Sequence, residues 1–185
     1  MSTIIRETRE TRVRVTLELH AGPTAPIAAP PRIATGVPFL DHMMVTFARY
    51  ANLVLEIEAT GDLRHHLVED VAITVGEALR REIPATCERF GERTVPMDDA
   101  LVQVALDAGG RAYWGGRLPS PLAEHWFRSF ADAARLTLHV RVLRGRDRHH
   151  VIEAAFKATG LALGQALAEG GAVFSTKGSV SLREE

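Results

Sequence analysis

The amino-acid sequence predicts an α+β fold made of two similar half-domains, and two observations lead to this prediction. The first is an internal repeat, in which the five-residue pattern His-His-x-x-Glu occurs at residues 65–69 and again at 149–153. The second is that both halves show the same succession of patterns, namely a strand, a short helix, a second strand and a long helix. Helices and strands that mix in this way around one core are typical of α+β proteins.

The repeat extends on both sides of this pattern. Matching residues up to Leu55 are 83 positions apart, whereas those from Gly61 onward, including the pattern itself, are 84 positions apart. The matching pairs are His42 with His125, Phe47 with Phe130, Ala48 with Ala131, Leu53 with Leu136, Leu55 with Leu138, Gly61 with Gly145, Gly76 with Gly160, Ala78 with Ala162 and Leu79 with Leu163. One inserted residue between Leu138 and Gly145 explains the change of spacing. We interpret the pattern as an internal duplication, with half-domains at 1–92 and 93–185 that together form one compact unit.

The spacing of apolar residues predicts the elements of each half. Strands are predicted where apolar and polar residues alternate, and helices where apolar residues recur three or four positions apart. The first half is expected to contain a strand at 12–19, a loop rich in Ala, Pro and Gly at 22–31, a short helix at 39–51, a strand at 53–58 and a long helix at 65–82, which Pro84 ends. The second half is expected to contain a strand at 100–108, a loop rich in Gly and Pro at 109–121, a short helix at 122–134, a strand at 135–143 and a long helix at 148–168.

The composition argues against several kinds of partner. The 185 residues carry a formal net charge of −1, so neither a nucleic acid nor an anionic membrane is expected to bind by bulk electrostatics. The single cysteine, Cys87, excludes an intramolecular disulfide and fits a reducing compartment. The N-terminal residues 1–10 lack the apolar core of a signal peptide, and no apolar run is long enough to span a bilayer. We therefore expect a cytoplasmic protein.

Six of the eight histidines occupy repeated positions, which points to bound metal. Residues four apart share one face of a helix, so the first histidine and the glutamate of each pattern can bind the same ion. The second histidine points about 100° away and must serve another ion. An arrangement that uses every group has two sets of ligands, His149 with Glu153, His66 and His42, and His65 with Glu69, His150 and His125.

Three imidazoles and one carboxylate per set suit Mn, Fe, Co, Ni or Zn better than Ca or Mg, which prefer oxygen ligands. The alternative is that two surface helices merely carry pairs of histidines. Because the pairs recur in register with a third histidine, the sequence favours a dinuclear or paired metal site.

Several basic and hydroxyl groups could bind an anion. Near the C-terminus, Ser175, Thr176 and Lys177 precede a glycine and could surround a phosphate. Arg89 and Arg111 lie in turn-like contexts beside glycines, and Lys157 follows Glu153 by one helical turn. Each of these three charged residues, taken alone, is better explained as a solvated surface charge, and the C-terminal cluster alone is a weak signal.

The ordered motifs of the chain resemble those of the imidazoleglycerol-phosphate dehydratase family of histidine biosynthesis. The motifs are GVPFLDHM at 36–43, HHLVED at 65–70, PMD at 96–98 followed by GR at 110–111, EHWF at 124–127, LHV at 138–140, HH to FKA at 149–158 and STKG at 175–178. The similarity runs from about residue 9 to residue 178. It departs from the family pattern in a shorter turn between Gly61 and His65, and at Thr46, Asp99 and Asp147, but no proposed metal ligand is lost.

The resemblance implies a fold, a reaction and an assembly. The fold would be two mixed β-sheets that sandwich a four-helix layer, as in the second domain of a small-subunit ribosomal protein. The reaction would be that of a hydro-lyase, the dehydration of D-erythro-imidazole-glycerol phosphate to imidazole-acetol phosphate. The resemblance also implies two Mn(II) ions per active site, at the interfaces of a large homo-oligomer that has 24 chains in the family.

The resemblance assigns roles to the residues that match the motifs. The six histidines and two glutamates of the two sets would be the metal ligands. The substrate phosphate would be bound by Arg89, Arg111, Lys157, Ser175, Thr176 and Lys177. Glu10 lies where the family has a glutamate beside the substrate, and Glu10 and Glu153 are the candidates for proton transfer. Two alternatives remain: a related metal-dependent lyase or hydrolase acting on another imidazole or phosphorylated molecule, and a metal-holding oligomer without catalytic activity.

Overall fold

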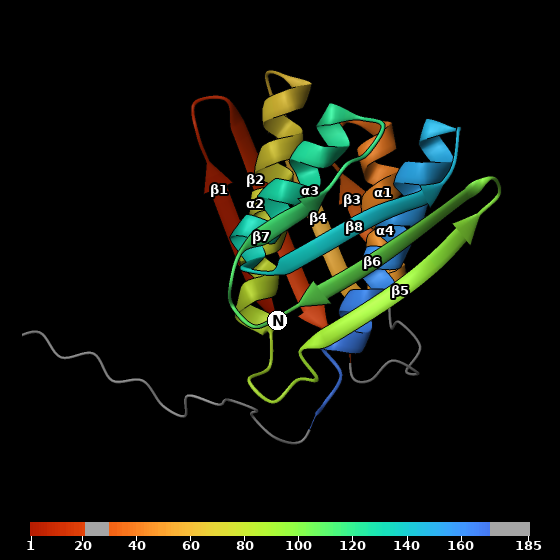
Figure 1. Ribbon diagram of the computed structural model, residues 1–185. Helices are drawn as coiled ribbons and strands as arrows, with labels where there is room; N and C mark the ends of the chain where they lie inside the picture. Colours follow the sequence, from red (N-terminus) through yellow and green to blue (C-terminus); the bar gives the residue numbers. More distant parts are fainter. Residues whose placement is uncertain (21–29, 171–185) are drawn as a thin grey trace, which may run out of the picture.

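The computed structural model describes residues 1–20 and 30–170, which form two sheets around a layer of four helices (Figure 1). The first half contains β1 (Ser2–Glu7), β2 (Thr11–Leu19), β3 (Arg32–Ala34), α1 (Pro38–Ala51), β4 (Leu53–Gly61) and α2 (Arg64–Glu82). The second half contains β5 (Phe90–Met97), β6 (Ala100–Asp107), β7 (Tyr113–Gly116), α3 (Pro121–Ala134), β8 (Thr137–Arg144) and α4 (Arg148–Ala166). The predicted division between residues 92 and 93 falls within β5, and it stays a prediction.

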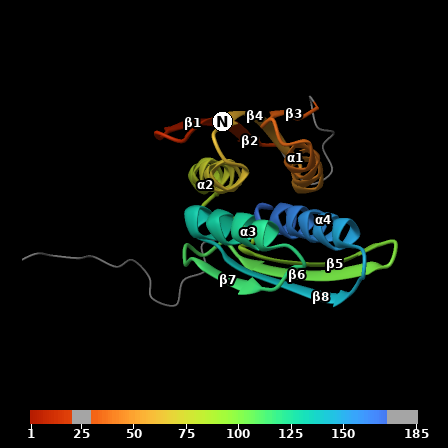
Figure 2. The ribbon, with the colours of Figure 1, turned by 90° about the horizontal axis from the view of Figure 1, so that it is seen from above.

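The two halves have the same topology. The strand orders are β1-β2-β4-β3 and β5-β6-β8-β7, and in each sheet the last pair is parallel while the other pairs are antiparallel. Seen from above, α1 and α2 lie on one sheet, α3 and α4 lie on the other, and the two helix pairs face each other (Figure 2). The predicted duplication and the two mixed sheets around four helices are therefore confirmed. None of the helices within 1–20 and 30–170 is both long and apolar enough to cross a membrane.

The helices and central strands lie within a few residues of their predicted positions, whereas four strands differ from the prediction. β1, β3 and β5 were not expected, and β7 lies inside the predicted loop at 109–121, so that loop prediction is wrong at Tyr113–Gly116. These strands are edge strands, and β3 and β7 are only three and four residues long. A short edge strand pairs through its backbone and has little apolar alternation to detect. The predicted loop at 22–31 lies largely outside the described residues.

The inserted residue of the second half appears as a β-bulge. Along β6 and β8, Val102 pairs with Val142 but Leu101 pairs with Arg144, so Leu143 has no counterpart on β6. The equivalent pair β2 and β4 keeps one unbroken register. A bulge absorbs one extra residue without reversing which side chains face the core. The insertion predicted between Leu138 and Gly145 is therefore Leu143 in the structure.

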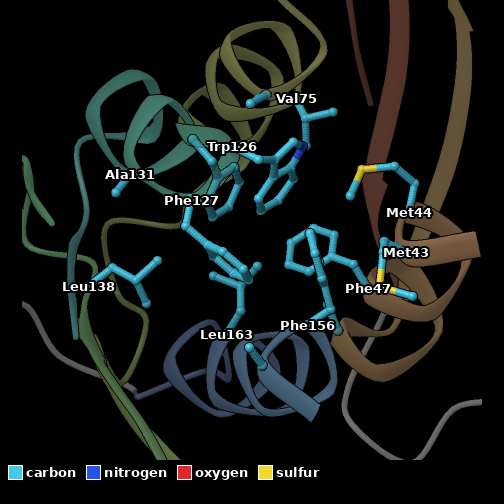
Figure 3. Packing of buried hydrophobic residues seen from close by; sticks show 14 of the residues in the cluster. Met43, Met44, Phe47, Val75, Trp126, Phe127, Ala131, Leu138, Phe156 and Leu163 are labelled. Atoms are coloured by element: carbon cyan, nitrogen blue, oxygen red, sulfur yellow. The ribbon is translucent and has the colours of Figure 1, made fainter. Parts of the chain in front are cut away.

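Aromatic residues fill the core where the four helices meet (Figure 3). Trp126 stacks on Phe130 with ring centroids 5.0 Å apart, and Phe156 from α4 packs on Trp126 at 4.6 Å. Phe47 from α1 meets Phe130 edge-on at 5.5 Å. Phe47 and Phe130 are a matched pair of the repeat, so equivalent residues of the two halves touch at the centre of the molecule.

Repeated glycines allow each long helix to approach the short helix of the other half. A Cβ on Gly160 of α4 would lie 2.9 Å from the backbone oxygen of Phe47 and from the backbone nitrogen of Ala51, both on α1. A Cβ on Gly76 of α2 would lie 2.8 Å from the backbone oxygen of Phe130 on α3. Such distances are too short for a carbon atom, and a backbone cannot yield as a flexible side chain can. The spacing between the two halves therefore depends on these two glycines.

The variant Gly160→Ala should lose about 1–3 kcal/mol of unfolding free energy, because its methyl group has no space against α1. Gly164→Ala is the matched control one turn later on α4, where a Cβ meets nothing closer than 3.5 Å. The control should be neutral or gain up to about 1 kcal/mol from helix propensity. Thermal unfolding of both variants followed by calorimetry measures the difference, and equal midpoints would contradict the close approach.

Candidate metal centre and active site

The first cluster of metal-ligating groups joins α1 to α4. His42 lies in the first turns of α1, and His149 and Glu153 lie one turn apart at the start of α4. The Nε2 atoms of His149 and His42 lie 3.0 Å and 3.3 Å from the same oxygen, Oε2 of Glu153. One ligand atom from each residue lies within 4.8 Å of the others. We call this group cluster 1.

Asp147 fixes the start of α4 and so the place of the pattern that follows. Its side chain accepts hydrogen bonds from the backbone N–H groups of His149, at 2.7 Å, and His150, at 3.4 Å. Such an N-cap satisfies backbone groups that would otherwise lack partners in the first helical turn. The first half has no such cap, because Leu63 occupies the position before α2.

The second cluster joins α3 to α2 and is the repeat of the first. His125 from α3 stacks on His65 from α2 with ring centroids 4.5 Å apart. The Nε2 atom of His125 lies 3.3 Å from Oε2 of Glu69, and all three residues again offer ligand atoms within 4.8 Å of one another. We call this group cluster 2. Each cluster thus combines a short helix of one half with the long helix of the other.

Glu153 is the most buried ligand of cluster 1, with a side chain 9% exposed. Burial raises its pKa, but hydrogen bonds from Lys157 and His42 more than offset this effect, so the pKa of Glu153 lies below its ordinary value. Lys157 reaches the second carboxylate oxygen of Glu153 at 2.9 Å. The carboxylate is therefore held in the ionised form that a metal ion requires.

The second histidine of each pattern points away from both clusters. Nδ1 of His66 lies 3.0 Å from Oδ1 of Asp62 and 3.5 Å from Oε2 of Glu10. Nδ1 of His150 lies 2.8 Å from Oδ1 of Asp99. Among residues 1–20 and 30–170, the structure thus brings together three members of each predicted ligand set and places the fourth elsewhere.

The acidic partners of these histidines change the pKa values on both sides. The hydrogen bond between Asp62 and His66 lowers the pKa of Asp62 and raises that of His66. Hydrogen bonds from the backbone N–H of Arg146 and then from His150 lower the pKa of Asp99 to about 2. The hydrogen bond to Asp99 raises the pKa of His150. Both carboxyl groups are therefore ionised at neutral pH.

Asp62 and Asp99 were not among the predicted site residues. Asp62 precedes His66 by four residues, a spacing that could have suggested the contact. Asp99 is far from His150 in sequence, but it immediately precedes β6, just as Glu10 immediately precedes β2. The alignment of the two halves therefore makes Asp99 the counterpart of Glu10, and this signal was present in the sequence.

The residues of the two clusters fit a divalent transition metal. Two imidazole nitrogens and one carboxylate oxygen are ligands that such ions accept, and the convergent geometry leaves further positions for other ligands. The Nε2 atom of His125 is buried and has no hydrogen-bond partner within the described residues, because its approach to Glu69 lacks hydrogen-bond geometry. A buried ring nitrogen without a partner costs about 1–3 kcal/mol, and an ion coordinated there would remove that cost.

The predicted phosphate-binding residues are only partly placed near the clusters. Lys157 contacts Glu153, whereas Arg89 donates two hydrogen bonds to Asp107, at 2.6 Å and 2.9 Å. This pairing lowers the pKa of Asp107, with a smaller contribution from the charge of Arg111. The backbone of Arg89 is bonded to the C-terminal end of α4, at Ala166. Ser175, Thr176 and Lys177 lie outside the described residues.

Arg89 is consequently far from cluster 1 of its own chain. Ala166 follows His149 by 17 residues along α4, which corresponds to roughly 25 Å at the rise of an α-helix. Glu10 likewise belongs to neither cluster, since its carboxylate lies beside His66 and is 55% exposed. One chain therefore separates groups that the sequence assigned to a single site.

Comparison with known proteins identifies the family. The family model for imidazoleglycerol-phosphate dehydratase matches residues 35–163. Imidazoleglycerol-phosphate dehydratase of Desulfitobacterium hafniense (strain Y51) is 42% identical over 193 residues, covering 95% of each chain. That of Desulforudis audaxviator (strain MP104C) is 44% identical over 194 residues, again covering 95% of each chain.

Solved structures agree with the sequences. The crystal structure of IGPD from Pyrococcus furiosus matches with a TM-score of 0.84 and 38% identity, covering 96% of this chain and 100% of that one. Imidazoleglycerol-phosphate dehydratase from Staphylococcus aureus subsp. aureus N315 matches with a TM-score of 0.76 and 33% identity, covering 91% of this chain and 99% of that one. With both clusters in place on the same fold, the chain belongs to the imidazoleglycerol-phosphate dehydratase family.

Proposed function

We propose that the protein is a hydro-lyase that converts D-erythro-imidazole-glycerol phosphate to imidazole-acetol phosphate in histidine biosynthesis, in the cytoplasm. The observation that carries this proposal is the pair of equivalent clusters on the fold of the dehydratase family. The substrate has an imidazole ring at one end and a phosphate at the other, and the chain offers metal-ligating groups for the first and basic groups for the second.

Loss of water from this substrate breaks one C–H bond and one C–O bond and gives an enol, which becomes the ketone when carbon takes up a proton. We propose Mn(II), two ions per active site, as the resident metal; a bound ion supplies Lewis-acid stabilisation of the anionic imidazole ring. Glu10 is proposed to carry a proton between the carbon and oxygen atoms, because its side chain is exposed and so accessible to a ligand. Glu153, the second candidate, already contacts two histidines and Lys157.

We also propose that the active sites are shared between copies of the chain. Each cluster holds three of its four predicted ligands, and His66 and His150 lie away from both clusters, where another copy could receive them. The distance between Arg89 and cluster 1 supports the same conclusion for phosphate binding. Arg89, Arg111, Lys157, Ser175, Thr176 and Lys177 are proposed to hold the phosphate, with some of these residues supplied by a neighbouring chain. A closed homo-oligomer, 24 chains in our proposal, satisfies this requirement.

Metal-stripped protein should not turn over imidazole-glycerol phosphate, and addition of Mn(II) should restore the activity. The physical reason is that the imidazole ring is a poor electron acceptor without a cation. Steady-state assays of product formation, together with metal analysis, measure both results. Protein that binds close to two Mn(II) per chain but does not act on this substrate would contradict the substrate and leave the metal sites intact.

The variant Glu10→Gln should bind Mn(II) as the wild type does but lose at least about a hundredfold in kcat, since it cannot accept a proton. Glu7→Gln is the matched control, because Glu7 is an exposed carboxylate of β1 that pairs only with Arg12 among the described ion pairs. The control should keep its activity. A Glu10→Gln protein with near-normal kcat would remove Glu10 from the proton transfer.

Removal of metal should reduce the size of the assembly, because ligands donated between chains would lose their ion. EDTA should shift the wild type to a smaller species in light-scattering chromatography, and His150→Ala should bind Mn(II) more than about tenfold more weakly. His139→Ala serves as control, since His139 is exposed on the outer face of the second sheet. An EDTA-treated wild type of unchanged mass, with full metal retention by His150→Ala, would show that the sites are not shared.

A further inference from the structure

We propose that Asp99 is a positioning residue that sets the tautomer of His150 and thereby leaves the Nε2 atom of that ring able to bind metal. The proposal rests on the proposed function only in that it takes His150 to be a metal ligand. It concerns a residue that contacts neither substrate nor metal and acts through the histidine.

The carboxylate of Asp99 uses both of its oxygens. Oδ2 accepts hydrogen bonds from the backbone N–H groups of Arg146, at 2.6 Å, and Asp147, at 3.2 Å. Oδ1 lies 2.8 Å from Nδ1 of His150. The carboxylate therefore joins the turn between β5 and β6 to the segment that starts α4, and it meets the ring from one fixed direction.

This geometry decides which ring nitrogen carries the proton. A neutral imidazole has one N–H group, and an ionised carboxylate can only accept. Nδ1 of His150 must then be the donor, which leaves a lone pair on Nε2. Nε2, at the far side of the ring, lies 3.3 Å from Oδ2 of Asp98. That longer approach lacks hydrogen-bond geometry, so the hydrogen bond to Asp99 is the contact that holds the proton on Nδ1.

The first half achieves the same result with a different residue and a different geometry. One oxygen of Asp62, Oδ1, accepts from both the backbone N–H of Leu63, at 2.6 Å, and Nδ1 of His66, at 3.0 Å. Glu10, the counterpart of Asp99, lies farther from that nitrogen, at 3.5 Å. Asp62 and Asp99 thus position the rings of His66 and His150. Glu10 is left for the proton transfer proposed for it.

The difference between the halves predicts opposite effects of an asparagine. In Asp99→Asn, the amide oxygen should face the two backbone N–H donors, because an NH2 group there would lose both hydrogen bonds. The NH2 group must then face Nδ1 of His150, which becomes an acceptor, and the proton moves to Nε2. In Asp62→Asn, the single oxygen can keep both of its hydrogen bonds, so His66 keeps its tautomer.

The test is Mn(II) affinity of the full-length protein, followed by the electron paramagnetic resonance of free Mn(II), for the wild type, Asp99→Asn, Asp99→Ala and Asp62→Asn. Asp99→Asn should bind about 10–100-fold more weakly than wild type. Asp99→Ala should lie between the two, because water can solvate either tautomer. Asp62→Asn should stay near wild type. A merely structural role predicts the reverse order, in which asparagine retains the backbone contacts and alanine is worst, and that order would overturn the proposal.

Nitrogen-15 spectra of the metal-free protein at pH 8.5 give a second readout that does not need metal binding or activity. The His150 signals, assigned by their loss in His150→Ala, should show a protonated Nδ1 in the wild type and a protonated Nε2 in Asp99→Asn. An unchanged tautomer in Asp99→Asn refutes the proposal. Failure of the proposed function would instead appear as absent dehydratase activity, with these tautomers as described.

Discussion

The contact between each long helix and the short helix of the opposite half determines where the ligand groups lie. Gly160 lets α4 meet α1 at backbone distance, and Gly76 does the same for α2 and α3. His42 can reach Glu153 only because α1 and α4 meet there, and the repeat imposes the same condition on His125 and Glu69. Neither half alone contains a complete cluster. A cation bound to either cluster would therefore bind the folded pair of halves and favour it over the unfolded chain by mass action.

The pattern of charge around the clusters follows from this arrangement. Lys157 keeps Glu153 ionised from within α4, while the acidic partners of His66 and His150 stand outside both clusters. A carboxylate behind a histidine fixes the ring in one orientation before any ligand arrives, which reduces the entropy that binding must remove. His66 and His150 are therefore held by hydrogen bonds to carboxylates, although they have no role within their own chain's clusters.

Much of the fold could be predicted from the sequence, because the duplication shows each element twice and apolar periodicity is strong in buried helices and central strands. Edge strands such as β7 could not, since backbone pairing leaves no pattern in side chains. In the site, helical spacing predicts the pairing of His149 with Glu153, and the repeat adds His42. The repeat makes Asp99 the counterpart of Glu10, but its contact with His150 depends on how a distant turn folds back, which helical spacing does not encode. Arg89 was assigned to the same site as the metal ligands by resemblance, but in a single chain it lies far from cluster 1. The sequence could not predict this separation, because it does not say which copy of the chain supplies each residue.

The bulge at Leu143 affects how readily the internal duplication can be detected. The extra residue increases by one the difference in residue number between equivalent positions of the two halves. A sequence comparison that holds this difference constant would therefore detect two unrelated shorter repeats. In the structure the insertion does not change which side chains face the core. Val142 still packs against it, and α4 begins one residue before its His-His pair, as α2 does. The structural symmetry between two half-domains can therefore persist when an alignment of their sequences no longer shows it. The condition is that each insertion is confined to one bulge in the strand that receives it.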